Sequence, residues 1–241
     1  MVEYNALLRL PSSDELPDSD DTPVDNELQD LVPALLRAIL SIIWADRQDW
    51  ILACDMGIYY DLDNPRVPIV PDGFLSVGVT KHKGEFGRKS YVMWEENFIP
   101  PIMVFEHVSH AYGGEYDAKM LKYAKLGALY YVLYNPQFYR RDRHEPFEVY
   151  KLIEGEYVLQ AGEPVWLPEL NLGIGRADSI FDSWEREWLF WYGQDGNRYP
   201  SPAEIIQQQA NSAKQQLEQE RARADRLAEK LKELGIDPND L

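Results

Sequence analysis

The sequence predicts an α/β fold, in which helices flank a mixed central sheet and a C-terminal coiled-coil helix follows. The main observation is residues 101–136, which read as a strand, a loop with paired glycines, a helix and a second strand. Such a βαβ unit joins parallel strands within a parallel or mixed sheet. Alternating apolar residues on both sides predict further strands. Residues 206–234 repeat apolar positions at steps of four and three, which is typical of a coiled coil.

The N-terminal part predicts an acidic arm and a first helix. Residues 11–26 are polar and acidic, with prolines and no aromatic residue, so we expect residues 1–26 to form a mobile arm. Apolar residues at near-helical spacing predict a helix over residues 28–45. Glu27 falls in its first turn, where an acid favours the helix N-terminus.

Short strands are predicted ahead of the βαβ unit, at residues 50–54, 57–60, 67–70 and 74–79. The run 67–70 ends in Pro71-Asp72-Gly73, which places an acid at the end of a strand. The stretch that follows, residues 80–89, is basic for this chain. It is either a loop that contacts phosphate or a plain solvated loop.

Within the βαβ unit we expect a strand over 102–109, a helix over 115–126 and a strand over 129–134. Strand side chains alternate between faces, so Glu106 shares a face with aliphatic residues and His107 lies on the other. An ionised carboxylate in such surroundings is costly unless a cation or hydrogen-bond donors meet it.

Two readings of these acids remain open. Asp72, Glu106 and lysines on the following helix can together form a divalent-metal site. Alternatively, Glu106 forms a buried ion pair with Lys119 and Asp72 is an ordinary turn residue. His107 is interpreted as a packed, hydrogen-bonded histidine rather than a catalyst.

After the βαβ unit, alternation predicts a hairpin over residues 147–159 and another short strand within 163–172. A tryptophan-rich stretch, residues 181–191, is expected to close the core or a dimer face. Prolines at 200–202 mark a boundary, and residues 203–236 are expected to form the coiled-coil helix, with self-pairing into a dimer as the first interpretation.

Several short pieces, taken in order, resemble a known family. They are Pro71-Asp72-Gly73, Phe105-Glu106-His107-Val108-Ser109, Asp117 with Lys119 and Tyr123, Gly127, Tyr130-Tyr131 and Asn135-Pro136. Their order and spacing resemble the Uma-type restriction endonuclease family, within the PD-(D/E)XK nuclease superfamily, over roughly residues 24–200. The resemblance implies a restriction-endonuclease-like domain over residues 27–200.

The resemblance also implies a site and an activity. Asp72, Glu106 and Lys119 would be catalytic in a Mg²⁺- or Mn²⁺-dependent hydrolysis of phosphodiester bonds in DNA. The metal ligands would be Asp72, Glu106 and the backbone carbonyl of His107, with Glu27 as a further candidate. The chain departs from the superfamily at Val108, where the lysine of the signature would stand on the same strand. The Uma-type pattern places its lysine on the next helix instead, where Lys119 stands.

The acidic composition favours a second interpretation, in which the protein is not a nuclease. The 241 residues are 45% hydrophobic, enough for one substantial domain, but the formal net charge is −17, whereas nucleic-acid binding usually shows as a basic patch. The alternative is a catalytically inactive protein that keeps the nuclease fold and oligomerises through its coiled coil. The single Cys54 and the lack of an apolar leader or spanning segment in the sequence lead us to expect a cytoplasmic protein.

Overall fold

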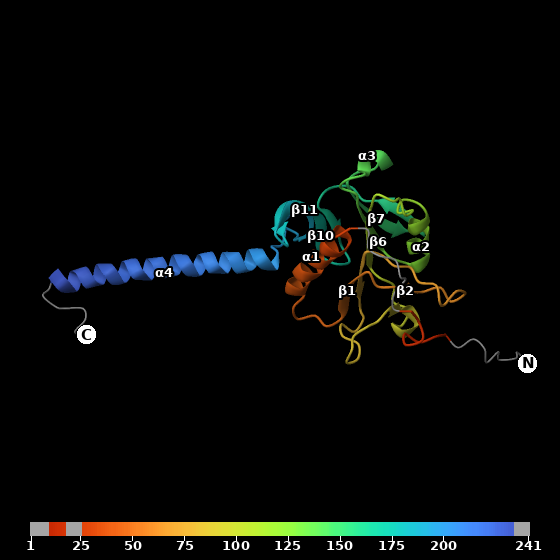
Figure 1. The fold of residues 1–241 in the computed structure, drawn as a ribbon, viewed down its shortest axis with the longest axis horizontal. Coiled ribbons are helices and arrows are strands. Elements are labelled where there is room, and N and C mark those ends of the chain that lie inside the picture. The colour runs from red at the N-terminus through yellow and green to blue at the C-terminus, as the bar shows by residue number, and fades with distance from the viewer. Residues whose placement is uncertain (1–9, 18–25, 234–241) are drawn as a thin grey trace, which may run out of the picture. The chain divides into compact units, whose positions relative to one another are not determined.

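The structure is a computed structural model that describes residues 10–17 and 26–233. The chain divides into two compact units, residues 1–199 and residues 200–241. The first unit contains the sheets and the second contains the long helix α4 (Pro202–Glu233) (Figure 1).

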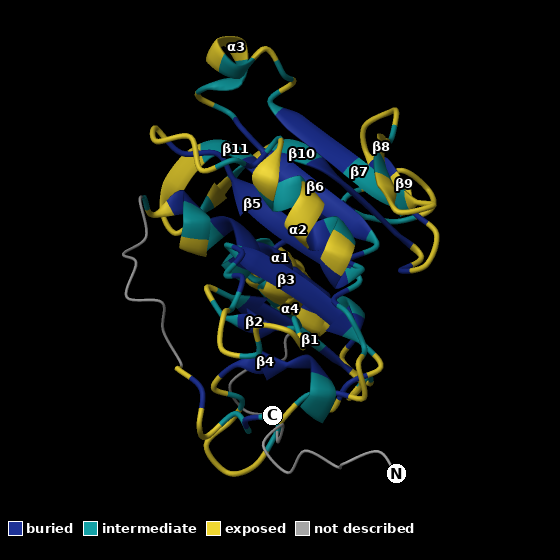
Figure 2. Cartoon of the chain, turned by 90° about the vertical axis from the view of Figure 1, so that its right-hand side faces the viewer, coloured by how far each residue is buried: buried dark blue, intermediate teal, exposed yellow. Residues whose placement is uncertain are grey.

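A six-stranded mixed sheet forms the centre of the first unit, as predicted. Its strands in spatial order are β1 (Trp50–Cys54), β3 (Gly73–Val77), β5 (Met103–His107), β6 (Tyr130–Tyr134), β7 (Phe147–Ile153) and β8 (Glu156–Leu159). β5 and β6 pair in parallel, and the other neighbouring strands pair antiparallel. The strands cross the middle of the domain and are largely buried (Figure 2).

The predicted βαβ unit is present as β5, α2 (Ala118–Leu126) and β6. The helix starts later than residue 115, because the Asp117 side chain accepts a hydrogen bond from the Ala118 N–H at its N-terminus. It ends at Gly127, which has a left-handed backbone with φ of 87° and accommodates the turn into β6.

One face of the sheet packs against α1 (Leu28–Ile43) and a second sheet. That second sheet has the order β11 (Trp184–Tyr192), β10 (Leu172–Phe181), β9 (Val165–Leu167). Trp188 and Trp191 are completely buried there, and the Trp191 indole donates to the Leu36 carbonyl oxygen at 2.9 Å. These tryptophans therefore close the core, one of the two roles expected for them.

The other face packs against α2, with Tyr123 and Leu126 buried in the same cluster as Val104 of β5 and Val108 just after it. A small parallel sheet of β2 (Ile58–Tyr59) and β4 (Tyr91–Val92) lies beside it, followed by the short 3₁₀ helix η1 (Met93–Glu95).

The strand predicted at residues 67–70 is wrong. Only an isolated bridge between Ile58 and Ile69 forms there. Pro68 and Pro71 lack backbone N–H groups, so this run cannot supply the regular ladder of donors that a strand needs.

Residues 10–17 pack on the domain, although the sequence predicts a mobile arm. Leu16 is buried, the Trp94 indole donates to the Pro11 carbonyl oxygen at 2.8 Å, and the Tyr59 hydroxyl donates to the Pro17 carbonyl oxygen at 2.8 Å. Ser13 donates to Glu95 through both its N–H and its hydroxyl, at 2.8 and 2.9 Å. The rest of the predicted arm, apart from Asn26, lies outside the described residues.

In the second unit, α4 starts with a reciprocal cap. The Ser201 N–H donates to Glu204 Oε2 at 2.8 Å, and the Glu204 N–H donates to Ser201 Oγ at 3.3 Å. Ile206, Leu217 and Leu227 of the predicted seam are exposed. The coiled coil stays a prediction, and its last residues, 234–236, lie outside the described residues. Across the described part of the chain, the helices are too short or too polar to cross a membrane.

Candidate active site

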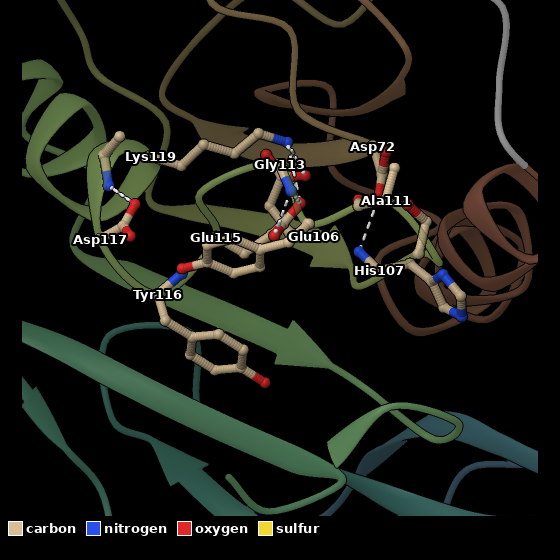
Figure 3. A network of polar contacts seen from close by, with 12 residues as sticks. Asp72, Glu106, His107, Ala111, Gly113, Glu115, Tyr116, Asp117 and Lys119 are labelled. Atoms are coloured by element: carbon tan, nitrogen blue, oxygen red, sulfur yellow. Dashed lines mark hydrogen bonds and ion pairs between the residues drawn. The ribbon is translucent and has the colours of Figure 1, made fainter. Parts of the chain in front are cut away.

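Asp72 and Glu106 are brought together by the pairing of β3 with β5. Gly73 pairs with Phe105, so Asp72, which precedes β3, lies next to the Glu106–His107 end of β5. The His107 backbone N–H donates to Asp72 Oδ2 at 2.6 Å (Figure 3). Asp72 therefore does more than form a turn, because it is fixed against the strand that carries Glu106.

Glu106 is almost completely buried, at 1% exposure, and α2 supplies its partners. Lys119 Nζ lies 2.8 Å from Glu106 Oε2, and the Tyr123 hydroxyl donates to Oε1. Lys119 and Tyr123 are four residues apart and so lie on the same face of the helix. Lys119, the lysine that the resemblance assigns to the site, contacts Glu106, whereas Lys125 of the same helix pairs with Asp61 at 2.7 Å.

Burial and mutual repulsion shape the charge of the site. Burial, followed by the negative charge of Glu106, raises the pKa of Asp72 well above its usual range. Burial also raises the pKa of Glu106, although Lys119 and the Tyr123 hydroxyl oppose the rise. Burial acts to lower the pKa of Lys119, but the Glu106 carboxylate outweighs it, so the pKa of Lys119 is raised and its ammonium stays charged near neutral pH.

Glu115 is a further acid at this site, where the sequence predicts only the start of a helix. It is buried, its Oε1 lies 3.9 Å from Lys119 Nζ, and both its oxygens accept the Gly113 N–H, at 3.2 and 3.0 Å. A Cβ at Gly113 would lie only 2.5 Å from Glu115 Oε1. The paired glycines, Gly113 and Gly114, were the available signal that the chain turns an acid inward here.

Two other predicted residues play lesser parts in this geometry. The His107 ring lies on the opposite face of β5 from Glu106, against Tyr134, and burial lowers its pKa to about 4. Its Nε2 has no hydrogen-bond partner among the described residues. Glu27 is exposed at the N-cap of α1, makes no side-chain cap bond, and has no hydrogen bond to Asp72 or Glu106 in the described structure.

The donor set suits a hard divalent cation. Asp72 and Glu106 offer carboxylate oxygens, which Mg²⁺ and Mn²⁺ prefer. With Glu115, three carboxyl groups stand near the single ammonium of Lys119, and the raised pKa of Asp72 reflects burial and a crowding of acids that a bound cation would relieve. Over the described residues, no group of three or more His, Cys, Asp or Glu side chains converges on one point. A metal here would therefore have two carboxylates and backbone or water oxygens as ligands.

Residues 21–178 match the sequence model of the Uma2 family, whose description reads "Putative restriction endonuclease". The chain belongs to the Uma2 family. The matched range contains Asp72, Glu106, Glu115 and Lys119, so all the acids and the lysine of the candidate site lie inside the part of the chain that defines membership. The helix α4 lies outside the matched range.

A crystal structure from Anabaena variabilis ATCC 29413, described as a "putative nuclease belonging to DUF820", is similar to the chain, with a TM-score of 0.43 and 13% identity. The alignment covers 66% of this chain and 88% of that one. No curated protein matches the chain.

Proposed function

We propose that this Uma2-family protein is an endonuclease that hydrolyses phosphodiester bonds of DNA and depends on Mg²⁺ or Mn²⁺. The observation that supports it best is that Asp72 is bonded to the His107 N–H at the Glu106 end of β5, while Lys119 of α2 lies 2.8 Å from Glu106. Family membership supports a nuclease as the general class.

In this proposal, Asp72, Glu106 and the backbone carbonyl of His107 hold the ion. A bound divalent cation would supply positive charge to a phosphoryl oxygen and acidify a nearby water. The His107 N–H, at 2.6 Å from Asp72 Oδ2, fixes the orientation of that carboxylate and leaves its other oxygen for a ligand.

Lys119 would stabilise negative charge at the phosphate and position the attacking water. Its raised pKa keeps the side chain protonated, so it suits electrostatic stabilisation and cannot readily act as a general base. Its side chain is 26% exposed, whereas that of Glu106 is 1% exposed, so Lys119 is the member of the pair that a substrate can reach. Tyr123 would orient Glu106 through its hydroxyl.

We further propose that α4 pairs with the same helix of a second copy. Ile206, Leu217 and Leu227 lie at heptad-related positions on it and are exposed. Apolar residues in a narrow seam of this kind are normally buried by a partner helix. A dimer would also be the assembly in the alternative reading, in which the fold serves only for interaction.

Plasmid nicking with purified full-length protein tests the catalytic proposal. We expect cleavage with Mg²⁺ or Mn²⁺, little with Ca²⁺, which accepts looser geometry, and none with EDTA. Asp72→Asn and Glu106→Gln should abolish nicking at nearly constant side-chain volume. Glu96→Gln is the matched control, because Glu96 is also a buried, ion-paired carboxylate, bound to Lys83 and Arg88. Equal residual nicking by wild type and Glu106→Gln would overturn the proposal.

A further inference from the structure

A surface next to the candidate active site combines parallel aromatic rings with arginines that the proposed chemistry does not use. The Tyr116 and His144 rings stack at 3.6 Å between centroids with 5° between their planes. The Tyr112 ring lies 6.4 Å from Tyr116, only 10° from parallel, and Tyr112 is 47% exposed. Arg140 and Arg143, in and just after the short helix α3 (Tyr139–Asp142), are exposed on the segment that leads to His144 of this stack. We call these five residues the ring-and-arginine surface.

The surface is held in place by a buried amide. Asn135 is fully buried, and its Nδ2 donates to the Tyr116 hydroxyl at 3.1 Å and to Asp142 Oδ2 at 2.9 Å. Arg141 donates to the His110 carbonyl oxygen at 2.7 Å. These hydrogen bonds connect the loop after β5 to the α3 segment. The loop that carries Tyr112 and Tyr116 is therefore held against the segment that carries the two arginines.

The two arginines of this surface form no ion pair with an acid of the described chain, so their charges can meet a phosphate. Arg140 and Arg143 have no ion-pair partner in the part of the chain that the structure describes, and Arg141 already neutralises Asp142. The loop over residues 80–89, the other basic stretch, differs. Three of its four Lys and Arg side chains pair with acids, namely Lys83 with Glu95 at 2.8 Å, Arg88 with Glu96 at 2.9 Å and Lys89 with Asp14 at 2.9 Å, while Lys81 lies over the Trp50 ring.

The surface continues directly into the candidate active site. Tyr116 follows Glu115, whose carboxylate lies 3.9 Å from Lys119 Nζ (Figure 3). The Tyr116 N–H donates to the Tyr112 hydroxyl at 3.2 Å, which fixes Tyr112 to the same loop. A ligand that lies over Tyr112 is therefore bound by the same short loop that carries Glu115.

We propose that the ring-and-arginine surface binds an unpaired strand of nucleic acid, with a base stacked on Tyr112 and phosphates on Arg140 and Arg143. Base faces are open to aromatic side chains only where the bases are unpaired, and stacking with a basic groove is how proteins hold single strands without reading sequence. The inference rests on the proposed function, because it takes this strand to be the substrate near the scissile bond.

Binding without catalysis tests the inference. Fluorescence anisotropy with the full chain in EDTA measures the affinity for a labelled twelve-nucleotide DNA strand, the same strand as RNA, and the matching DNA duplex. We expect either single strand to bind more tightly than the duplex. Tyr112→Ala should weaken single-strand binding by roughly 5- to 100-fold, the usual range for loss of one stacked base. Phe86→Ala is the matched control, since Phe86 is 91% exposed in the other loop and should leave binding unchanged.

The salt dependence of binding tests the role of Arg140 and Arg143 separately. Arg140→Ala/Arg143→Ala removes two phosphate contacts, so the slope of log Kd against log salt should fall by about 1.4 for a single strand. Arg37→Ala/Arg66→Ala makes the same change in charge at two other exposed positions and should leave the slope unaltered. A larger effect in this control pair would show that the binding is carried elsewhere.

Tyr112→Trp keeps an aromatic face and should restore binding, which separates stacking from loss of fold. Unchanged single-strand affinity in Tyr112→Ala, or equal affinity of wild type for duplex and single strand, overturns the inference even if the protein nicks plasmids. Conversely, Tyr112-dependent binding in a protein that never nicks DNA keeps this surface and removes the catalytic proposal.

Discussion

Replacing Lys119 with methionine distinguishes two interpretations of the site, a metal centre and an ion pair between Lys119 and Glu106 that binds no metal. The change removes the ammonium that lies 2.8 Å from Glu106 Oε2 and leaves that carboxylate, 1% exposed, with the Tyr123 hydroxyl as its remaining side-chain partner. Removing one partner of a buried pair typically costs about 3–5 kcal/mol. Because the Lys119 side chain is 26% exposed, water offsets part of the loss, and we expect the free energy of unfolding without metal to fall by about 2–3 kcal/mol.

Metal should reverse this loss if the site binds a cation. A divalent ion between Asp72 and Glu106 would neutralise the carboxylate that Lys119 no longer meets. Without metal, the expected loss corresponds to a Tm about 4–12 °C below wild type for a chain of this size. Saturation at a hundred times Kd would add about 2.7 kcal/mol of stability and recover most of that difference.

Differential scanning fluorimetry in EDTA and in excess Mg²⁺ gives the measurement. Lys122→Met is the control, because Lys122 is an exposed lysine of the same helix and its loss should change stability by no more than about 0.5 kcal/mol. A Tm of Lys119→Met that does not respond to Mg²⁺ would refute the metal centre and leave a structural ion pair. An equal Mg²⁺ response in Glu106→Gln would show that the ion binds elsewhere.

Three further predictions concern other parts of the chain. Tyr123→Phe removes a hydroxyl donor from the buried Glu106 carboxylate, so thermal unfolding should show a loss of about 1–3 kcal/mol. Burial raises the pKa of Cys54 to about 11. Since only the thiolate reacts, iodoacetamide at pH 8 should label Cys54 slowly in native protein and fast in urea-unfolded protein. Equal labelling rates would contradict the burial of Cys54. Truncation before residue 203 should leave a folded domain of lower oligomeric order by light scattering, and unchanged order would argue against pairing through α4.

The sequence was informative where a short-range pattern decides the structure. Alternation along residues 103–107 places Glu106 on the same face as Val104, and the structure buries it on that face, against α2. Helical spacing places Lys119 and Tyr123 one turn apart, and both reach Glu106. The positions of Glu106, Lys119 and Tyr123 follow from the two-residue period of the strand, the 3.6-residue period of the helix and the βαβ connection between them.

Features that depend on turns or on distant contacts were missed. The hairpin of β10 and β11 turns through Asp182 and Ser183, both with positive φ, at 48° and 61°. Such a turn is usually signalled by asparagine or glycine, and neither stands here. Glu115 faces inward because of the conformation of the loop around Gly113, which no periodicity describes. The packing of residues 10–17 depends on Glu95 and Trp94, about eighty residues away.

The cation of the candidate site, Lys119, comes from α2, while the proposed carboxylate ligands come from β5 and from the residue just before β3. An α-helix turns by about 100° for each residue, so the rotational phase of α2 decides which side chain faces Glu106. That phase is set by the Asp117 cap at one end and by Tyr123 and Leu126, which anchor the helix to the sheet. A single deletion within residues 110–114 would leave the carboxylates where they are and would strain or rotate the helix, moving the lysine away. The length of the loop before α2 thus decides whether Lys119 reaches Glu106, although the loop itself supplies neither the lysine nor the two proposed carboxylate ligands.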